Sequence, residues 1–325
     1  MSMIQDNNFP KPYKSSYIKT NDGHDLYYEL VGNPTGLPIV FLHGGPGSGF
    51  QKSHRDLFDL NKSNVVFFDQ RGAGRSKPKR SLKNNSTDYL VEDLELIRKK
   101  LNIEKWLVVG GSWGSTLALA YAQKYKKYIN GIVIRSVFLG TKDEILWAFT
   151  NAAKLFRPEL WDWWENLVNK EINNMDPLYF YGNRLESREK FDAESAAIVW
   201  SIYESILSQI EGENIELPKS FNKKYFMNNT LKPNTPYFEW HYIKNNFFLD
   251  YKKLINNAYK LNGIPGRIIQ GRYDLLCPPT NAFDISEKWK DSVLYIVDDA
   301  GHSANSDPMR QTLIAAIKEL VDENI

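Results

Sequence analysis

The chain has 325 residues, of which 42% are hydrophobic, so it is long enough to bury a sizeable core in one large α/β domain with an insert, or in two domains. Its 41 Lys and Arg residues nearly balance its 39 Asp and Glu residues, and no basic block is interleaved with aromatic residues, so we do not expect nucleic acid as a partner. No apolar run approaches the roughly 18 residues of a membrane span.

Two further features bear on where the protein works. The first twenty residues are polar, are broken by Pro10 and Pro12, and contain no apolar region of the kind found in signal peptides. The single cysteine, Cys277, cannot form an internal disulfide, and this usage favours a reducing compartment. We therefore expect a soluble cytoplasmic protein that does not contact a membrane.

The first 138 residues alternate apolar runs with turns and helical patterns. An Asp-Gly turn at 22–23 predicts a β-hairpin formed by its two flanks. Continuous apolar runs are typical of buried parallel strands, and they occur at 38–42, 64–68, 106–109 and 129–134. Helical patterns follow at 89–101 and 116–124.

A glycine-dense loop, His-Gly-Gly-Pro-Gly at 43–47, follows the first of these buried strands. Ligand sites in open α/β sheets lie at the carboxyl ends of the strands, and glycines let backbone N–H groups approach a ligand closely. We expect the N–H of one loop glycine, Gly45, to stabilise an oxyanion. A phosphate-binding loop is disfavoured because G-x-x-x-x-G-K-[ST] is absent.

The sequence Gly110-Gly111-Ser112-Trp113-Gly114 lies between a buried strand and a helix of small residues. G-x-S-x-G in that setting is the nucleophile-elbow pattern. Glycines are needed because the strained turn runs close to neighbouring backbone. Ser112 is therefore a candidate nucleophile at a helix N-terminus, where negative charge is favoured. The N–H of Trp113 is a candidate oxyanion donor.

The alternation of strands and helices stops at about residue 140 and resumes at about 260. The intervening segment has helical or irregular patterns, no convincing buried strand, and six of the nine tryptophans. These aromatic residues either form a core of their own or line an apolar pocket. We predict a helical cap at 139–259, inserted between 1–138 and 260–325, which together form the α/β core.

The last part of the chain restores the α/β pattern. Apolar runs at 266–270 and 292–297 predict two more strands, and helical patterns follow each of them, at 280–289 and 307–321. The whole pattern predicts an α/β fold, with a mostly parallel sheet covered by helices on both faces.

A serine nucleophile needs a base within hydrogen-bond reach, and the base needs an orienting carboxylate. Of the five histidines, His302 is the best base by position, since it follows the last predicted strand at the same sheet edge as Ser112. Asp274 follows another strand and is the expected orienting carboxylate. Asp298 and Asp299 are competitors, although they are so near His302 that a suitable loop is harder to build. The order Ser–Asp–His is that of α/β-hydrolases.

Five motifs together resemble the prolyl iminopeptidases, α/β-hydrolases that remove N-terminal proline from peptides. They are HGGPG at 43–47, DQRGAGRS at 69–76, GGSWGS at 110–115, GRYD at 271–274 and GH at 301–302. The resemblance covers nearly the whole chain. It implies that Ser112 is the nucleophile, Asp274 the orienting acid and His302 the base, with Gly45 in the oxyanion hole. It implies neither a metal nor a cofactor.

The same resemblance implies a substrate site in the cap. Two family motifs containing a glutamate are matched at 200–204 and 239–242, which places the substrate's charged imino group between Glu204 and Glu239. The residues around Glu204 are nearly all apolar, and a carboxylate there is costly unless it is paired, for example with a substrate ammonium. The alternative is that these glutamates face solvent. The resemblance also places Phe138 beside the proline ring and Arg135 in a position to support the glutamates.

Two residues depart from the family pattern. Tyr203 replaces the second tryptophan of the cap motif, and Ser136 stands where glycine is usual. Both departures bear on the shape of the pocket, and so on how strict the preference for proline is, rather than on the reaction.

We therefore predict a serine aminopeptidase that releases N-terminal proline from short peptides through an acyl-enzyme. One alternative is an aminopeptidase of the same family with a broader preference. Others are an esterase, lactonase or amidase, because this fold hosts many chemistries, and a catalytically inactive binding module. The cap carboxylates discriminate between these classes, since an ester or lactone needs no cationic anchor.

Overall fold

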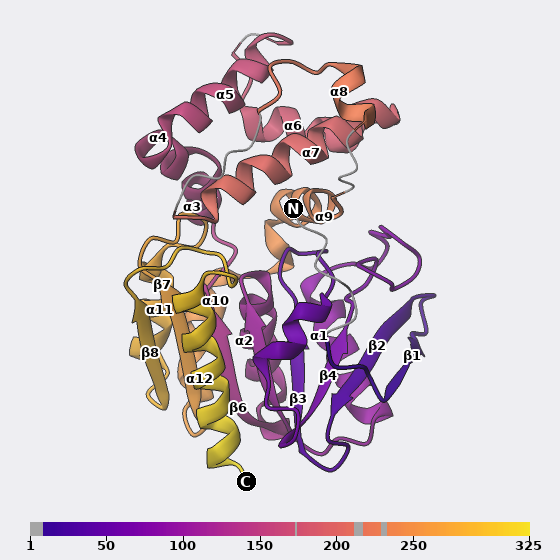
Figure 1. The fold of residues 1–325 in the computed structure, drawn as a ribbon, viewed down its shortest axis with the longest axis vertical. Coiled ribbons are helices and arrows are strands. Elements are labelled where there is room, and N and C mark those ends of the chain that lie inside the picture. The colour runs from indigo at the N-terminus through magenta and orange to yellow at the C-terminus, as the bar shows by residue number, and fades with distance from the viewer. Residues whose placement is uncertain (1–8, 173, 211–216, 229–232) are drawn as a thin grey trace.

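The computed structural model describes residues 9–172, 174–210, 217–228 and 233–325. An eight-stranded sheet, in the order β1-β2-β4-β3-β5-β6-β7-β8, forms its centre (Figure 1). The pairs β1–β2 and β2–β4 are antiparallel and all the others are parallel. The strands are β1 (Lys14–Lys19), β2 (Asp25–Gly32), β3 (Leu37–Leu42), β4 (Ser63–Phe68), β5 (Trp106–Gly111), β6 (Ile129–Arg135), β7 (Gly266–Gly271) and β8 (Ser292–Val297).

Helices cover both faces of this sheet. Alternate residues of a strand point to opposite faces, and in β3 Val40 belongs to one buried cluster while Ile39 belongs to the other. The first cluster includes residues of α1, α2 and α11, and the second includes residues of α12. Their bounds are α1 (Thr87–Lys100), α2 (Trp113–Tyr125), α11 (Pro279–Lys288) and α12 (Asp307–Glu323). The predicted α/β fold with a mostly parallel sheet is confirmed.

The chain between β6 and β7 is helical, with no strand among its described residues. Figure 1 shows α4 to α8 gathered at one end of the sheet. The helices are α3 (Lys142–Leu146), a π-helix η3 (Trp147–Asn151), α4 (Ala152–Phe156), α5 (Pro158–Asn169), α6 (Pro177–Leu185), α7 (Lys190–Leu207), α8 (Lys223–Asn228), α9 (Thr235–Lys244) and α10 (Tyr251–Asn256).

This helical segment has a buried aromatic cluster of its own. Trp164, Trp200 and Tyr203 are fully buried in it. The later part of the segment packs instead against the sheet, since Phe247 and Leu254 belong to the cluster on the face covered by α1 and α2. The limits 139 and 259 of the cap stay a prediction.

Short 3₁₀ turns complete the described fold. These turns are η1 (Lys52–Leu57), η2 (Lys126–Tyr128), η4 (Asn246–Phe248) and η5 (Ala258–Leu261). Among the residues that the structure describes, no helix combines the length and the apolar character required to cross a membrane.

Candidate active site

Ser112 occupies the sharp turn between β5 and α2. Its backbone has φ 56° and ψ −126°, a conformation that L-residues rarely adopt, and its N–H donates to the carbonyl of Arg135 at 2.9 Å. The flanking glycines are required by space. A Cβ on Gly110 would lie 2.4 Å from the carbonyl oxygen of Gly114, and one on Gly114 would lie 2.2 Å from that of Leu42. The turn therefore holds the Ser112 side chain clear of the sheet edge.

His302 and Asp274 lie in the loops that follow β8 and β7. The Nδ1 atom of His302 is 2.9 Å from Oδ2 and 3.0 Å from Oδ1 of Asp274. Oδ1 also accepts hydrogen bonds from the backbone N–H groups of Leu276 at 3.0 Å and Cys277 at 2.8 Å. The carboxylate is thus oriented by its own loop, and it fixes which ring nitrogen of His302 faces it.

The surroundings of Asp274 keep it ionised. Burial acts to raise the pKa of this carboxyl group, but the nearby His302 and the hydrogen bonds from His302 and Cys277 outweigh burial and lower the pKa below its ordinary value. The competitor Asp298 forms an exposed ion pair with Arg272 instead. Of the acidic residues considered from the sequence, Asp274 is therefore the one placed to orient His302.

Two backbone N–H groups are placed near Ser112. Trp113 is the first residue of α2, so its N–H has no partner within the helix. Gly45 lines the same cavity as Ser112 and has φ 107°, a conformation that favours glycine. Its loop is held by His43, whose Nε2 accepts a hydrogen bond from the backbone N–H of Gln70 at 3.0 Å.

A cavity of about 320 Å³ brings the predicted residues together. It is lined by groups from the sheet edge and from the helical segment above it. The predicted residues among them are Gly45, Ser112, Phe138, Glu204, Glu239 and His302. The aromatic rings of Phe138 and Phe247 pack edge to face, with centroids 4.9 Å apart, and form part of its apolar wall.

The two glutamates are neighbours on the cap side of this cavity. Burial raises the pKa of Glu239, and burial together with the negative charge of Glu239 raises the pKa of Glu204 well above its ordinary value. Oε2 of Glu239 is buried and has no hydrogen-bond partner. When two carboxyl groups are held close together in a water-poor site, their ionised forms are stabilised by a bound cation. They do not face open solvent, which was the alternative.

Arg135 differs from the other predicted residues, because it does not line this cavity. Its guanidinium group lies against Gly111, donates to the backbone carbonyl of His302, and donates to Oγ of Ser136 at 2.8 Å. Strand β6 ends at Arg135 beneath the elbow, so its side chain is directed to the His302 loop rather than to the cap glutamates. The hydrogen bonds of Arg135 therefore go to Ser136 and to the His302 loop, and not to the glutamates that it was predicted to support.

The two departures from the family pattern lie outside the cavity wall. Tyr203 is fully buried and donates its hydroxyl to the carbonyl of Ala148 at 3.1 Å, so it packs the cap. Ser136 is buried with φ 50°, a conformation in which glycine is the unstrained choice. Neither side chain would contact a substrate bound in this cavity.

Two residues that contact Asp274 were missed or undervalued in the sequence. Gln270 donates to the carbonyl of Cys277 at 2.9 Å and to Oδ2 of Asp274 at 3.4 Å, and it accepts from the N–H of Val137 at 3.1 Å. An amide residue at the end of an apolar strand is the signal that would have pointed to Gln270. Cys277 lines the cavity, and burial raises the pKa of its thiol well above the ordinary value.

Asp274, Cys277 and His302 are the one group of possible metal ligands found among the described residues, with ligand atoms within 4.8 Å of one another. A metal ion held by this group would need Cys277 as a thiolate and Asp274 as a free carboxylate. Here burial disfavours the thiolate of Cys277, and Asp274 already accepts a hydrogen bond from His302. The group is therefore better suited to proton transfer than to holding a metal.

Comparisons with known proteins find relatives over nearly the whole chain. A family model described as the alpha/beta hydrolase fold matches residues 38–308. A proline iminopeptidase of Arabidopsis thaliana is 38% identical over 311 residues, which cover 95% of this chain and 80% of the relative. A proline iminopeptidase of Xylella fastidiosa (strain 9a5c) is 36% identical over 310 residues, which cover 95% and 97%.

The fold is also similar to solved structures. The crystal structure of the proline iminopeptidase of Mycobacterium smegmatis matches with a TM-score of 0.61, covering 96% of this chain and 100% of that one. The sequence identity is 15%, so this likeness concerns the fold alone.

Proposed function

Because the chain belongs to the proline iminopeptidase family of α/β-hydrolases, we propose that it is a serine aminopeptidase that releases N-terminal proline from short peptides. The observation that carries this proposal is the pair Glu204 and Glu239, which lines the same small cavity as Ser112 and His302. A free N-terminal imino group is positively charged, so it can form ion pairs with the two carboxyl groups. The carbonyl carbon of the first residue then lies beside Oγ of Ser112. The apolar ring packs beside Phe138.

The proposed reaction proceeds in two halves. Oγ of Ser112 attacks the first carbonyl carbon while His302 takes its proton, and the N–H groups of Gly45 and Trp113 stabilise the oxyanion. His302 then gives the proton to the departing amine, which leaves an acyl-enzyme on Ser112. Water, deprotonated by His302, releases proline in the second half. Asp274 stabilises the imidazolium in both halves, and no metal or cofactor takes part.

The helical segment limits which bonds are cleaved. We propose that 139–259 acts as a cap, since Glu204 of α7 and Glu239 of α9 line the same cavity as Ser112. A volume of about 320 Å³ suits one residue rather than a through-running chain. Only the first residue of a peptide fits, and internal bonds are spared. We also propose a cytoplasmic location, because Cys277 is the only cysteine and is a free thiol; cell fractionation tests it.

Hydrolysis of aminoacyl-naphthylamides tests the proposed activity. Pro-naphthylamide should be cleaved far faster than the Ala, Leu and Phe compounds, and N-acetyl-Pro-naphthylamide should be inert because it lacks the cation. Comparable rates for Ala, Leu and Phe would favour the broader aminopeptidase. Turnover of simple esters with no activity on any of these amides would reject the aminopeptidase and favour an esterase.

Replacing Arg135 with glutamine should lower kcat about 10- to 100-fold and leave KM nearly unchanged. The reason is that the guanidinium group holds the backbone of the His302 loop, and a small misplacement of a catalytic base is costly. Arg135→Lys should recover part of the rate, since it keeps the charge and one donor. A rise in KM with kcat intact would instead favour the role predicted from the sequence, in which Arg135 supports the substrate-binding glutamates.

A further inference from the structure

Residues 136–141 connect the end of β6 to the start of α3 and have no regular secondary structure. Val137 and Leu139 are fully buried, whereas Phe138 between them is only partly buried and lines the catalytic cavity. Buried backbone groups that belong to no strand or helix need other hydrogen-bond partners. Side chains from three different elements supply these partners to residues 137–139, which we call the strap.

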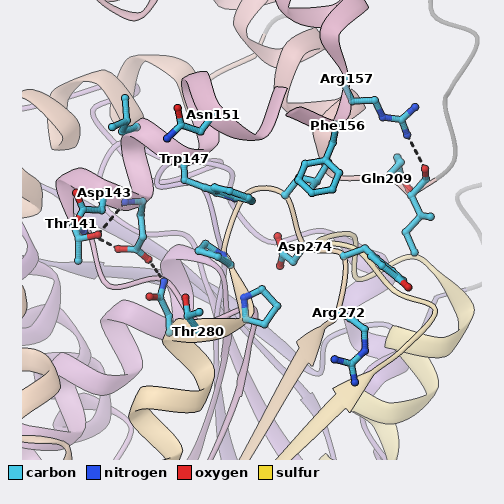
Figure 2. Close-up of a pocket in the computed structure, with 18 of the residues that line it drawn as sticks. Thr141, Asp143, Trp147, Asn151, Phe156, Arg157, Gln209, Arg272, Asp274 and Thr280 are labelled. Atoms are coloured by element: carbon cyan, nitrogen blue, oxygen red, sulfur yellow. Dashed lines mark hydrogen bonds between the residues drawn. The ribbon is translucent and has the colours of Figure 1, made fainter. Parts of the chain in front are cut away.

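The two flanks of the strap are fixed by Gln270 and Glu144. Oε1 of Gln270 accepts a hydrogen bond from the N–H of Val137 at 3.1 Å. Oε1 of Glu144 accepts one from the N–H of Leu139 at 2.9 Å. The other oxygen of Glu144 accepts from the N–H of Thr141 at 2.7 Å, a contact drawn in Figure 2, and so caps α3. With both flanks held, a change in the middle of the strap should stay local.

Phe138, in the middle of the strap, is held by two hydroxyl groups from the first turn of α2. Oγ of Ser115 accepts a hydrogen bond from the N–H of Phe138 at 3.1 Å. Oγ1 of Thr116 donates one to the carbonyl of Phe138 at 2.6 Å. Both of these side chains are fully buried. The cavity wall that Phe138 forms is therefore positioned by the helix that begins directly after Ser112.

The hydroxyl of Ser115 can be removed without releasing the elbow. It donates to the carbonyl of Ser112 at 2.6 Å, but that carbonyl also accepts the backbone N–H of Ser115 at 2.8 Å. What is lost is the acceptor for the N–H of Phe138. An unpaired buried N–H is unfavourable, so Phe138 should shift toward the cavity, where its N–H can bind water. Neither Ser115 nor Thr116 lines the cavity, so neither contacts a substrate bound there.

We propose that Ser115 and Thr116 are positioning residues that set the preference for proline by fixing Phe138 against the ring of the substrate. Contact with an aromatic wall weakens steeply with distance, and an alanine side chain has no ring to gain from it. A displaced Phe138 should therefore slow the release of N-terminal proline much more than that of N-terminal alanine. The substrate in this assignment rests on the proposed function, whereas the hold on Phe138 does not.

Ser115→Ala and Thr116→Val each remove one hydroxyl, and the second variant keeps the shape of the side chain. We expect each to lower the ratio of kcat/KM for Pro-naphthylamide to that for Ala-naphthylamide about tenfold. Labelling of Ser112 by a fluorophosphonate should keep the rate of the parent, because the catalytic residues are unchanged. Ser195→Ala is the matched control. Ser195 is fully buried in α7, and its hydroxyl also donates to the carbonyl three residues earlier, at 3.1 Å.

Hydrogen–deuterium exchange measured by mass spectrometry gives a readout that needs no activity. The amides of residues 137–139 should exchange at least about tenfold faster in Ser115→Ala and in Thr116→Val than in the parent. Ser195→Ala should leave their exchange unchanged. Thermal unfolding verifies the fold of each variant, and if Ser115→Ala does not fold, Thr116→Val decides both measurements.

Two kinetic results would overturn the proposal. One is an unaltered ratio of the Pro to the Ala compound in both variants, and the other is an equal loss of rate with both compounds, which would indicate a general structural role. Unchanged exchange at 137–139 would show that the two hydroxyls do not hold Phe138. If the parent does not prefer Pro-naphthylamide, the proposed function fails, while the exchange still decides whether Ser115 and Thr116 fix the strap.

Discussion

Replacing Ser112 with alanine is expected to lower kcat for Pro-naphthylamide by about 10⁴- to 10⁶-fold, equivalent to ~5–8 kcal/mol of transition-state stabilisation. In the proposed reaction, Oγ of Ser112 is the only protein atom that forms a covalent bond with the substrate. Removing it leaves the oxyanion donors and the binding groups in place, which accounts for the residual rate. The unfolding temperature should not change, since alanine is smaller than serine and the turn is held by backbone contacts.

Steady-state kinetics and thermal unfolding measure the two parts of this result. Ser205→Ala is the matched control, because Ser205 lines the same cavity from the cap and takes no part in the reaction. We expect its rate to stay within about tenfold of the parent. Wild-type protein should also be labelled by a fluorophosphonate, and Ser112→Ala should not. A residual rate above a few per cent would show that Ser112 is not the nucleophile.

Replacing Glu204 with glutamine is expected to weaken catalysis and to stabilise the fold. For catalysis, losing one charge of a buried anchor costs ~2–4 kcal/mol, so kcat/KM for Pro-naphthylamide should fall roughly 30- to 1,000-fold. The discrimination against N-acetyl-Pro-naphthylamide should fall with it. Glu194→Gln on the same helix is the control, since Glu194 forms a peripheral ion pair with Lys190 at 3.8 Å.

The effect of Glu204→Gln on stability depends on pH with a definite sign. Burial raises the pKa of Glu204 in the folded state above the unfolded value of about 4.3, and that of Glu239 rises to about 7. The folded protein therefore holds these protons more tightly, and stability is lost as pH rises through the folded pKa values. Glutamine cannot ionise, so the variant avoids the cost of a buried carboxylate. Its free energy of unfolding should therefore rise by ~1–3 kcal/mol at pH 8 and stay unchanged at pH 4.

Denaturant unfolding at pH 4 and pH 8 decides the matter. A stability gain at both pH values would point to packing rather than to ionisation. No gain at pH 8, together with unchanged selectivity for a free N-terminus, would mean that Glu204 is not the amine anchor. In that case the aminopeptidase proposal would lose the observation on which it depends.

Local sequence patterns determined the sheet and the elbow. Apolar runs such as 106–109 and 129–134 are long enough only for buried strands, and β5 and β6 occur there. Gly110 and Gly114 indicated that neighbouring backbone segments lie close together at the turn. In the structure, a Cβ at either site would overlap a carbonyl group. Chain order then placed Asp274 and His302 at the same edge as Ser112, since the carboxyl ends of parallel strands meet there.

The tertiary structure decided what sequence spacing does not encode. Arg135 and Phe138 are three residues apart, yet one supports the His302 loop from beneath and the other lines the cavity, because the chain turns sharply at Ser136. Pairing of Glu204 with Glu239 depends on how α7 packs on α9. Direction, burial and contacts between distant elements arise only from packing, whereas strands, turns and catalytic residue types are local properties that the sequence by itself determined.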